Sequence, residues 1–279
     1  MIKHYFITGD THGEAGTIAR LNALKTQYPS FDPANTALII LGDVGFNYWL
    51  NKKDWKHKKH VSEFGYTIYC VRGNHEERPE NLGYGTVYDN NVEGIVYADP
   101  DYPLIRYFMD GGEYVINGKS CLVIGGAYSI DKWHRIEMAA WSGNKHSGWF
   151  KDEQLTKEEM DKISKSVCGK HYDFVLTHTC PLSWQPTDLF LGFINQATVD
   201  NSMEIWMEEL KDTFTWDVWC FGHYHDDRIQ KSYVEMFYTD IQNMEEIASR
   251  WEKYKESGVL DWWLEIIKET SPCEQMQEG

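Results

Sequence analysis

The sequence lacks long apolar runs and paired cysteines. No segment approaches the roughly 18 to 20 consecutive apolar residues that a membrane-spanning helix needs. The short apolar run at the N-terminus contains Lys3 and His4, which is not typical of a signal peptide. The six cysteines form no CxxC pair, and Cys70, Cys121 and Cys220 lie within apolar runs, so we interpret them as reduced core thiols. We therefore expect a cytoplasmic protein that does not enter the membrane.

The chain also has few basic residues compared with acidic ones. The chain has 27 Lys and Arg against 43 Asp and Glu, a formal net charge of −16 over 279 residues. A protein that grips long nucleic acid needs a basic surface for phosphate contacts, so this charge argues against that class of partner. A small phosphorylated substrate stays compatible with it if metal ions reverse the sign of the charge locally.

What the sequence does have is a series of short apolar runs that end in polar residues, most of them next to glycine. Runs of this length, rich in Ile, Val, Tyr and Phe, predict strands that are buried on both faces. They cover residues 5–10, 37–43, 66–74, 120–129, 172–179 and 218–223.

Helical patterns lie between some of these strands. Residues 13–27 and 155–167 place apolar side chains at helical spacing, whereas residues 94–126 have the turn signals of consecutive hairpins. Strands separated by helices favour an α/β architecture, and the hairpins indicate a mixed sheet or two sheets.

The C-terminal part has a different character. Apolar residues recur at i, i+4 and i+7 in two stretches that begin at Ile247 and Leu260, with Ser and Gly at 257–258 between them. We predict a domain over residues 1–241 and an extension of amphipathic helices over residues 242–279. The helices either pack back on the domain or bind a partner, which includes a second copy of the chain.

The predicted strand ends share one kind of chemistry. In open α/β sheets, functional groups collect beyond the carboxyl ends of the strands. Each polar residue alone is more typical of a turn, but every one of these side chains is able to bind a metal, and a preceding glycine lets the chain bend toward a shared point. If the last strand continued through its two histidines, both would project from the same side. The residues are Asp10, His12, Asp43, Asn74, His75, His178, His223 and His225.

These motifs, GDTHG, GD, GNHE, a later strand-end histidine and GHYH, resemble the calcineurin-like metallophosphoesterase family in that order. The match spans residues 10–225. The resemblance implies a β-sandwich of mixed sheets flanked by helices, in α/β/β/α layers, with two divalent metal ions at one edge. Mixed imidazole and oxygen ligands suit Mn²⁺, our first expectation, with Fe and Zn²⁺ as alternatives.

The resemblance also assigns roles to individual residues. It implies that Asp43 bridges the two ions. It also implies that His75 contacts the substrate and protonates the leaving oxygen, while a hydroxide between the ions attacks phosphorus. The first ion takes Asp10, His12, Asp43 and His225, and the second takes Asp43, Asn74, His178 and His223.

Two arginines are candidate phosphate ligands. Arg72 precedes GNHE as it does in the Ser/Thr protein phosphatases, but GDVGFNYW lacks the arginine of their GDxxDRG motif. Arg135 follows the strand end GGAYS and would replace that missing clamp. The alternative for Arg135 is a solvated helix start capped by Ser129 or Asp131.

Two further segments carry open alternatives. Tyr48 and Trp49 follow a strand end, where they either stack on a flat leaving group or pack the loop. WKHKKH, residues 55–60, looks like a metal-binding histidine pair, but we interpret it as a solvated basic helix face.

The leading hypothesis is a metal-dependent phosphoesterase acting on a small phosphodiester or nucleotide-like substrate, since GHYH is similar to the phosphodiesterase side of the family. The alternatives are a phosphomonoesterase, including a protein phosphatase, and a non-catalytic protein-binding scaffold of the same fold. All seven ligand positions and His75 are filled, which favours the enzyme over the scaffold.

Overall fold

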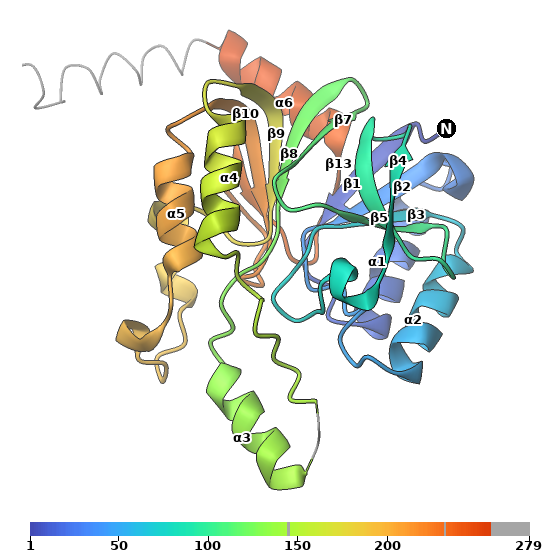
Figure 1. The fold of residues 1–279 in the computed structure, drawn as a ribbon. Helices are drawn as coiled ribbons and strands as arrows, with labels where there is room; N and C mark the ends of the chain where they lie inside the picture. The colour runs from blue at the N-terminus through green and yellow to red at the C-terminus, as the bar shows by residue number, and fades with distance from the viewer. Residues whose placement is uncertain (144–145, 232, 258–279) are drawn as a thin grey trace, which may run out of the picture.

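Two packed mixed sheets with helices on their outer faces make up the body of the protein in the computed structural model, which describes residues 1–143, 146–231 and 233–257 (Figure 1). This confirms the expected α/β/β/α sandwich. The described helices are α1 (Glu14–Gln27), α2 (Lys52–Ser62), α3 (Lys132–Ser142), α4 (Lys157–Val167), α5 (Ser202–Leu210) and α6 (Met244–Glu256). None of them has the length and apolar character needed to cross a membrane.

The first sheet has seven strands in the order β13-β1-β2-β3-β6-β5-β4. Its strands β1, β2, β3 and β6 run parallel, so their carboxyl ends meet at one edge. Thr8, Ile40 and Cys70 are register partners at that edge. The bounds are β1 (His4–Thr8), β2 (Thr36–Ile40), β3 (Thr67–Cys70), β4 (Gly85–Asp89), β5 (Gly94–Ala98), β6 (Ile105–Phe108) and β13 (Ile241–Asn243).

The second sheet has six strands in the order β11-β12-β10-β9-β8-β7. Here β8, β9 and β10 are parallel, and Ile124, Thr177 and Phe221 are register partners at their ends. The bounds are β7 (Gly112–Ile116), β8 (Lys119–Ile124), β9 (His171–Thr177), β10 (Thr215–Phe221), β11 (Arg228–Lys231) and β12 (Val234–Met236).

The core lies between the sheets and under the outer helices because side chains alternate along each strand. Tyr5 and Ile7 of β1 pack in the central cluster with Phe174 and Leu176 of β9. The intervening Phe6 packs on the opposite face with Leu21 and Leu24 of α1. The central strands are therefore buried on both faces, as the apolar runs predicted.

The C-terminal helix α6 is part of this core. Its Met244, Ile247 and Trp251 join the central cluster, and β13, directly before it, pairs antiparallel with β1. The first predicted C-terminal helix thus packs back on the body, and the expected boundary after residue 241 falls within β13. The second stretch, which begins at Leu260, lies outside the described residues.

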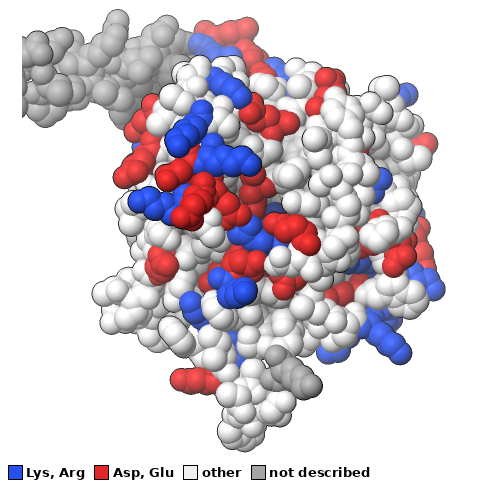
Figure 2. All heavy atoms as spheres, viewed as in Figure 1, with Lys and Arg blue, Asp and Glu red and all other residues white. Residues whose placement is uncertain are grey.

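Helix α3 stands apart from the body. Figure 1 shows it projecting on two extended connections. None of its residues is buried, and Trp133 and Trp141 are 63% and 85% exposed. Figure 2 shows mixed acidic and basic side chains over the body, while the tip of this projection is largely uncharged.

Candidate metal centre

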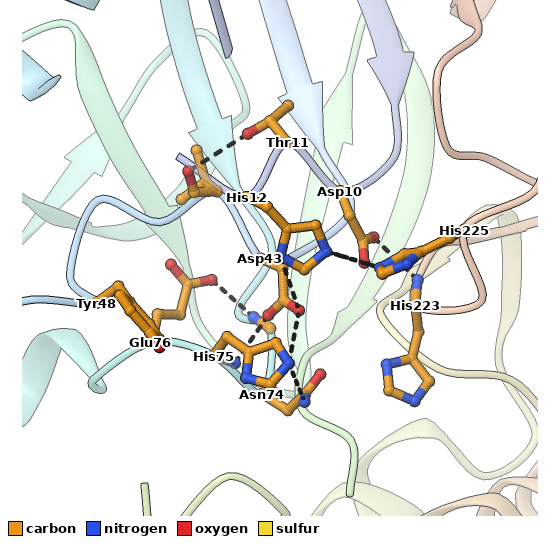
Figure 3. A network of polar contacts seen from close by, with 12 residues as sticks. Asp10, Thr11, His12, Asp43, Tyr48, Asn74, His75, Glu76, His223 and His225 are labelled. Atoms are coloured by element: carbon orange, nitrogen blue, oxygen red, sulfur yellow. Dashed lines mark hydrogen bonds and ion pairs between the residues drawn. The ribbon is translucent and has the colours of Figure 1, made fainter. Parts of the chain in front are cut away.

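All seven predicted ligands and His75 lie at the edge where the parallel strands of both sheets end. Figure 3 shows six of the ligands, all but His178, together with His75. Each ligand comes from the segment directly after a strand, which explains how residues more than 200 positions apart meet. The segment after β1 carries Asp10 and His12, that after β2 carries Asp43, that after β3 carries Asn74, that after β9 carries His178, and that after β10 carries His223 and His225.

The backbone turns sharply at four of these positions. His12, Asp43, His223 and His225 have φ values of 47°, 48°, 71° and 56°. This left-handed region is unfavourable for residues other than glycine and is found where function requires it. Because β10 ends at Phe221, the expectation that a strand aims both histidines to one side is wrong; two left-handed residues aim them instead.

The glycines before the ligands make room for ligands from other strands. A Cβ at Gly42 would lie 2.0 Å from His178 Nδ1, and one at Gly73 would lie 1.9 Å from Asp43 Oδ1. A Cβ at Gly222 would lie 2.4 Å from Asp10 Oδ1. These glycines therefore permit close approach between strands in addition to bending the chain.

The first ligand cluster contains Asp10, His12 and His225. The Nε2 atoms of the two histidines are 2.7 Å apart, and they lie 3.6 Å and 3.3 Å from Asp10 Oδ2. Asp10 Oδ1 accepts the backbone N–H of His223 at 2.9 Å, whereas Oδ2 is buried and makes no hydrogen bond within the described residues. A buried carboxylate oxygen that faces two imidazole nitrogens fits a divalent metal, whose ligand bonds are about 2.0–2.2 Å.

The second cluster surrounds His178. Its Nδ1–H donates to the carbonyl of Leu41 at 2.7 Å, which leaves Nε2 as a lone pair. Asn74 Oδ1 lies 2.8 Å from that Nε2, and Asp43 Oδ1 lies 3.7 Å from it. Acceptors this close repel each other unless they share a cation. The ring of His223 packs beside that of His178, with centroids 5.0 Å apart.

A buried relay fixes the amide of Asn74. Its Nδ2 donates to Ser129 Oγ at 2.8 Å, and Ser129 Oγ donates to Glu153 Oε2 at 2.5 Å. The amide oxygen is thereby turned toward His178. From the sequence, Ser129 is predicted only as a helix cap and Glu153 is not predicted at all, since nothing in the local pattern connects either residue to Asn74.

The charge states suit metal binding. Burial alone would raise the pKa values of Asp10 and Asp43, but the positive charge that nearby histidines carry when protonated, above all His178 for Asp10 and His75 for Asp43, holds both below their ordinary range, and a metal ion would supply the same charge in place of those protons. Burial, reinforced by His178, lowers the pKa of His223 to about 3. The two acids are thus ionised and His223 is neutral, as metal ligands must be.

His75 sits beside the clusters. Its backbone N–H donates to Asp43 Oδ1 at 2.8 Å, and its ring Nε2 is 3.9 Å from Asp43 Oδ2. Its Nδ1 is buried without a hydrogen bond in the described part of the chain. Burial lowers the pKa of His75.

A cavity of about 240 Å³ opens directly beside the centre. Arg135 reaches it from α3, with Nε 2.7 Å from Asp131 Oδ2 and Nη1 donating to the Tyr48 hydroxyl at 2.6 Å. The projecting helix therefore contributes a cation to this pocket. The lining residues are His12, Gly13, Asp43, Gly45, Tyr48, Trp49, His75 and Arg135.

Arg72, the other arginine candidate, does not line this cavity. Its guanidinium is buried and donates to Asp110 Oδ2 at 2.8 Å and to the carbonyl of Glu153 at 2.8 Å. It borders a separate cavity instead. Because its donors are used inside the fold, we do not carry Arg72 into the substrate site.

Comparisons with known proteins agree with the motifs. The family model described as calcineurin-like phosphoesterase matches residues 4–227. No curated protein matches the chain. Among solved structures, phosphopantetheinyl hydrolase from Mycobacterium tuberculosis is similar, with 12% identity, a TM-score of 0.40 and coverage of 85% of this chain and 90% of that one. A cold-active protein-tyrosine phosphatase of a psychrophilic Shewanella species has 12% identity, a TM-score of 0.31 and coverage of 90% and 73%. Likenesses this distant carry no argument about activity.

Proposed function

The chain belongs to the calcineurin-like phosphoesterase family and is a hydrolase of phosphate esters, and on that premise we propose that it cleaves a small phosphodiester at a centre of two divalent metal ions. The observation that carries the proposal is the pair of ligand clusters that share one edge with the cavity. Asp43 Oδ1 lies 3.7 Å from His178 Nε2 and its Oδ2 lies 3.9 Å from His12 Nδ1, while Asp10 belongs to both clusters. We assign Asp43 the bridging role that the family motif gives it.

We assign the ligands as the family motifs do. Mixed nitrogen and oxygen donors favour Mn²⁺, with Fe or Zn²⁺ as alternatives. When bound, two such ions activate water for attack on phosphorus and neutralise charge on the phosphate. Asp10, His12, Asp43 and His225 hold the first ion, and Asp43, Asn74, His178 and His223 hold the second.

His75 acts as the acid that protonates the departing oxygen. It lines the cavity and is fixed through its backbone bond to Asp43. Burial lowers the pKa of the ring and the Asp43 carboxylate opposes this, and the negative charge of a bound phosphate would raise the pKa further toward the protonated form that an acid needs.

Arg135 binds a non-bridging phosphate oxygen. Its guanidinium borders the cavity, and its contacts with Asp131 and Tyr48 orient it. This arginine comes from α3, whereas the protein phosphatases take theirs from the GDxxDRG motif. The difference counts against a phosphoprotein substrate. Tyr48 and Trp49 form a wall that suits the second ester group of a diester.

The test is a comparison of a generic diester and a generic monoester. Protein loaded with Mn²⁺ should hydrolyse bis(4-nitrophenyl) phosphate with a kcat/KM at least about tenfold above that for 4-nitrophenyl phosphate, a difference of about 1.4 kcal/mol in transition-state binding. A nucleotide panel then ranks natural leaving groups. Preference for the monoester would replace the diester proposal, and a metal-loaded protein inert toward both would favour the scaffold alternative.

A further inference from the structure

The loop between Asp43 and α2, residues 44–51, carries Tyr48 and Trp49 into the cavity, and we call it the pocket-wall loop. Helix α2 faces this loop with charged and polar side chains. Asp54, His57 and Lys58 are buried, so the interpretation of residues 55–60 as a solvated basic face is wrong at two positions. Only the other residues of that segment are exposed.

Asp54 binds the tip of the loop through both carboxylate oxygens. The backbone N–H of Trp49 donates to Oδ1 at 3.0 Å, and that of Leu50 donates to Oδ2 at 2.7 Å. Leu50 has a φ of 52°, a conformation that needs such support in a residue other than glycine. Asp54 is 6% exposed, so its carboxylate is largely removed from water, while Trp49 and Leu50 stay exposed on the other side of these part-buried bonds.

Lys58, one turn further along α2, binds the base of the loop. Its Nζ donates to Asn47 Oδ1 and to Asp99 Oδ2, both at 2.8 Å, and to the Tyr84 hydroxyl at 2.5 Å. His57, between them, contacts the carbonyl of Gly45 at 3.4 Å. One face of α2 therefore holds the loop at several successive positions.

Packing alone does not explain this arrangement. A buried ion pair gives little net stability compared with apolar side chains of the same volume, because both charges lose their hydration. Asp54 and Lys58 instead fix the position of the loop, because their hydrogen bonds define where its backbone lies. The ligand Asp43 is held separately by His75 N–H, so the wall and the metal centre have different supports.

We propose that Asp54 and Lys58 are positioning residues that hold the pocket-wall loop as a fixed surface and thereby set affinity for the ester group beyond the scissile phosphate. This inference rests on the proposed phosphodiesterase function. Tyr48 and Trp49 are the side chains through which it acts on the substrate, so neither Asp54 nor Lys58 needs to touch it.

The decisive variant is Asp54→Asn, which keeps the shape of the side chain and removes one of its two acceptors. Glu63→Gln is the matched control, because Glu63 is an exposed acid at the end of the same helix. The first readout is amide exchange of the peptide that contains Trp49 and Leu50, measured by mass spectrometry. We expect exchange about tenfold faster in Asp54→Asn, as for the loss of a hydrogen bond to a charged group, and no change in Glu63→Gln.

The second readout separates the wall from the metal centre. In Mn²⁺-loaded protein, Asp54→Asn should raise the KM for bis(4-nitrophenyl) phosphate about fivefold, with kcat within about twofold. The inhibition constant of inorganic phosphate should change by less than about twofold, because Asp131 still holds Arg135 when Tyr48 moves. The double variant Lys58→Met, Asp99→Asn, which removes the buried charges together, should repeat the pattern. Unchanged amide exchange, or equal weakening of diester and inorganic phosphate, would overturn the inference. If the wild-type protein hydrolyses neither ester, the proposed function fails, while the exchange measurement still decides the role of Asp54.

Discussion

Two helices support two walls of one pocket, and they do so in different ways. Helix α2 holds the Tyr48 side through buried Asp54 and Lys58, whereas α3 has no buried residue and delivers Arg135 from a projection (Figure 1). The walls meet where Arg135 donates to the Tyr48 hydroxyl. Buried polar residues thus support one wall, while the arginine that we propose to bind the substrate comes from a helix without buried residues, where a few polar contacts orient it.

The largest effect should lie between the two walls, at Asp43. Asp43→Asn removes a charge that faces both ligand clusters, so we expect loss of bound Mn²⁺ and a fall in turnover beyond the roughly 100-fold that outer ligand contacts reach. Metal analysis and diester turnover measure this. Asp212→Asn, at a side chain that is 78% exposed, is the control. A fully active Asp43→Asn protein would show that neither wall serves a metal centre here.

His75→Ala should have the next largest effect. Loss of a general acid lowers turnover by about 100-fold or more. Metal content should stay near normal, because His75 is not among the proposed ligands. Turnover that is unchanged in fully metallated protein would remove His75 from the proposed mechanism.

Arg135→Ala tests the exposed wall. Loss of a charge-assisted contact of about 1.5–3 kcal/mol should lower kcat/KM for the diester by about 10- to 150-fold. Arg135→Lys should recover part of this, since it keeps the charge without the fork. Trp141→Ala, on the same helix but directed to solvent, should leave the kinetics unchanged. An equal loss from Trp141→Ala would mean that the whole face of α3 contacts the substrate.

The buried wall should show a pH dependence that the exposed wall does not. Burial lowers the pKa of His57 to about 4, with Lys58 and His60 acting in the same direction and Glu14 opposing them. At His57 the unfolded chain therefore binds more protons between about pH 6.5 and 4, so the contribution of this residue to stability is present above that interval and falls by about 3 kcal/mol as the pH drops through it. Urea denaturation at a series of pH values measures this. His57→Gln should flatten the slope, whereas exposed His134→Gln on α3 should not.

The sequence predicted the strands and the convergence of the candidate ligands at one edge because both depend on local order. Buried parallel strands appear as continuous apolar runs, and their ends place Asp10, Asp43 and Asn74 at one edge whatever the loops do. Residues at strand ends therefore converge as expected. Their assignment to individual metal ions stays a prediction.

The parts that the sequence did not predict depend on partners far along the chain. From the sequence, Lys58 is predicted to be solvated, but in the structure it contacts Asp99, which is 41 positions away. Arg72 reads as a phosphate ligand until Asp110, 38 positions away, takes its guanidinium. Periodicity reports which face is apolar, and it carries no information about a buried charge whose counterpart lies on another element.

Three glycines of the motifs each lie directly against a ligand that follows a different strand. A side chain at Gly73 would strike Asp43, one at Gly42 would strike His178, and one at Gly222 would strike Asp10. A substitution at one of these glycines would therefore displace a ligand in a different motif, so no motif can change independently of the others. Such a centre is therefore inherited, or transferred to another scaffold, only as the complete set of motifs, glycines included.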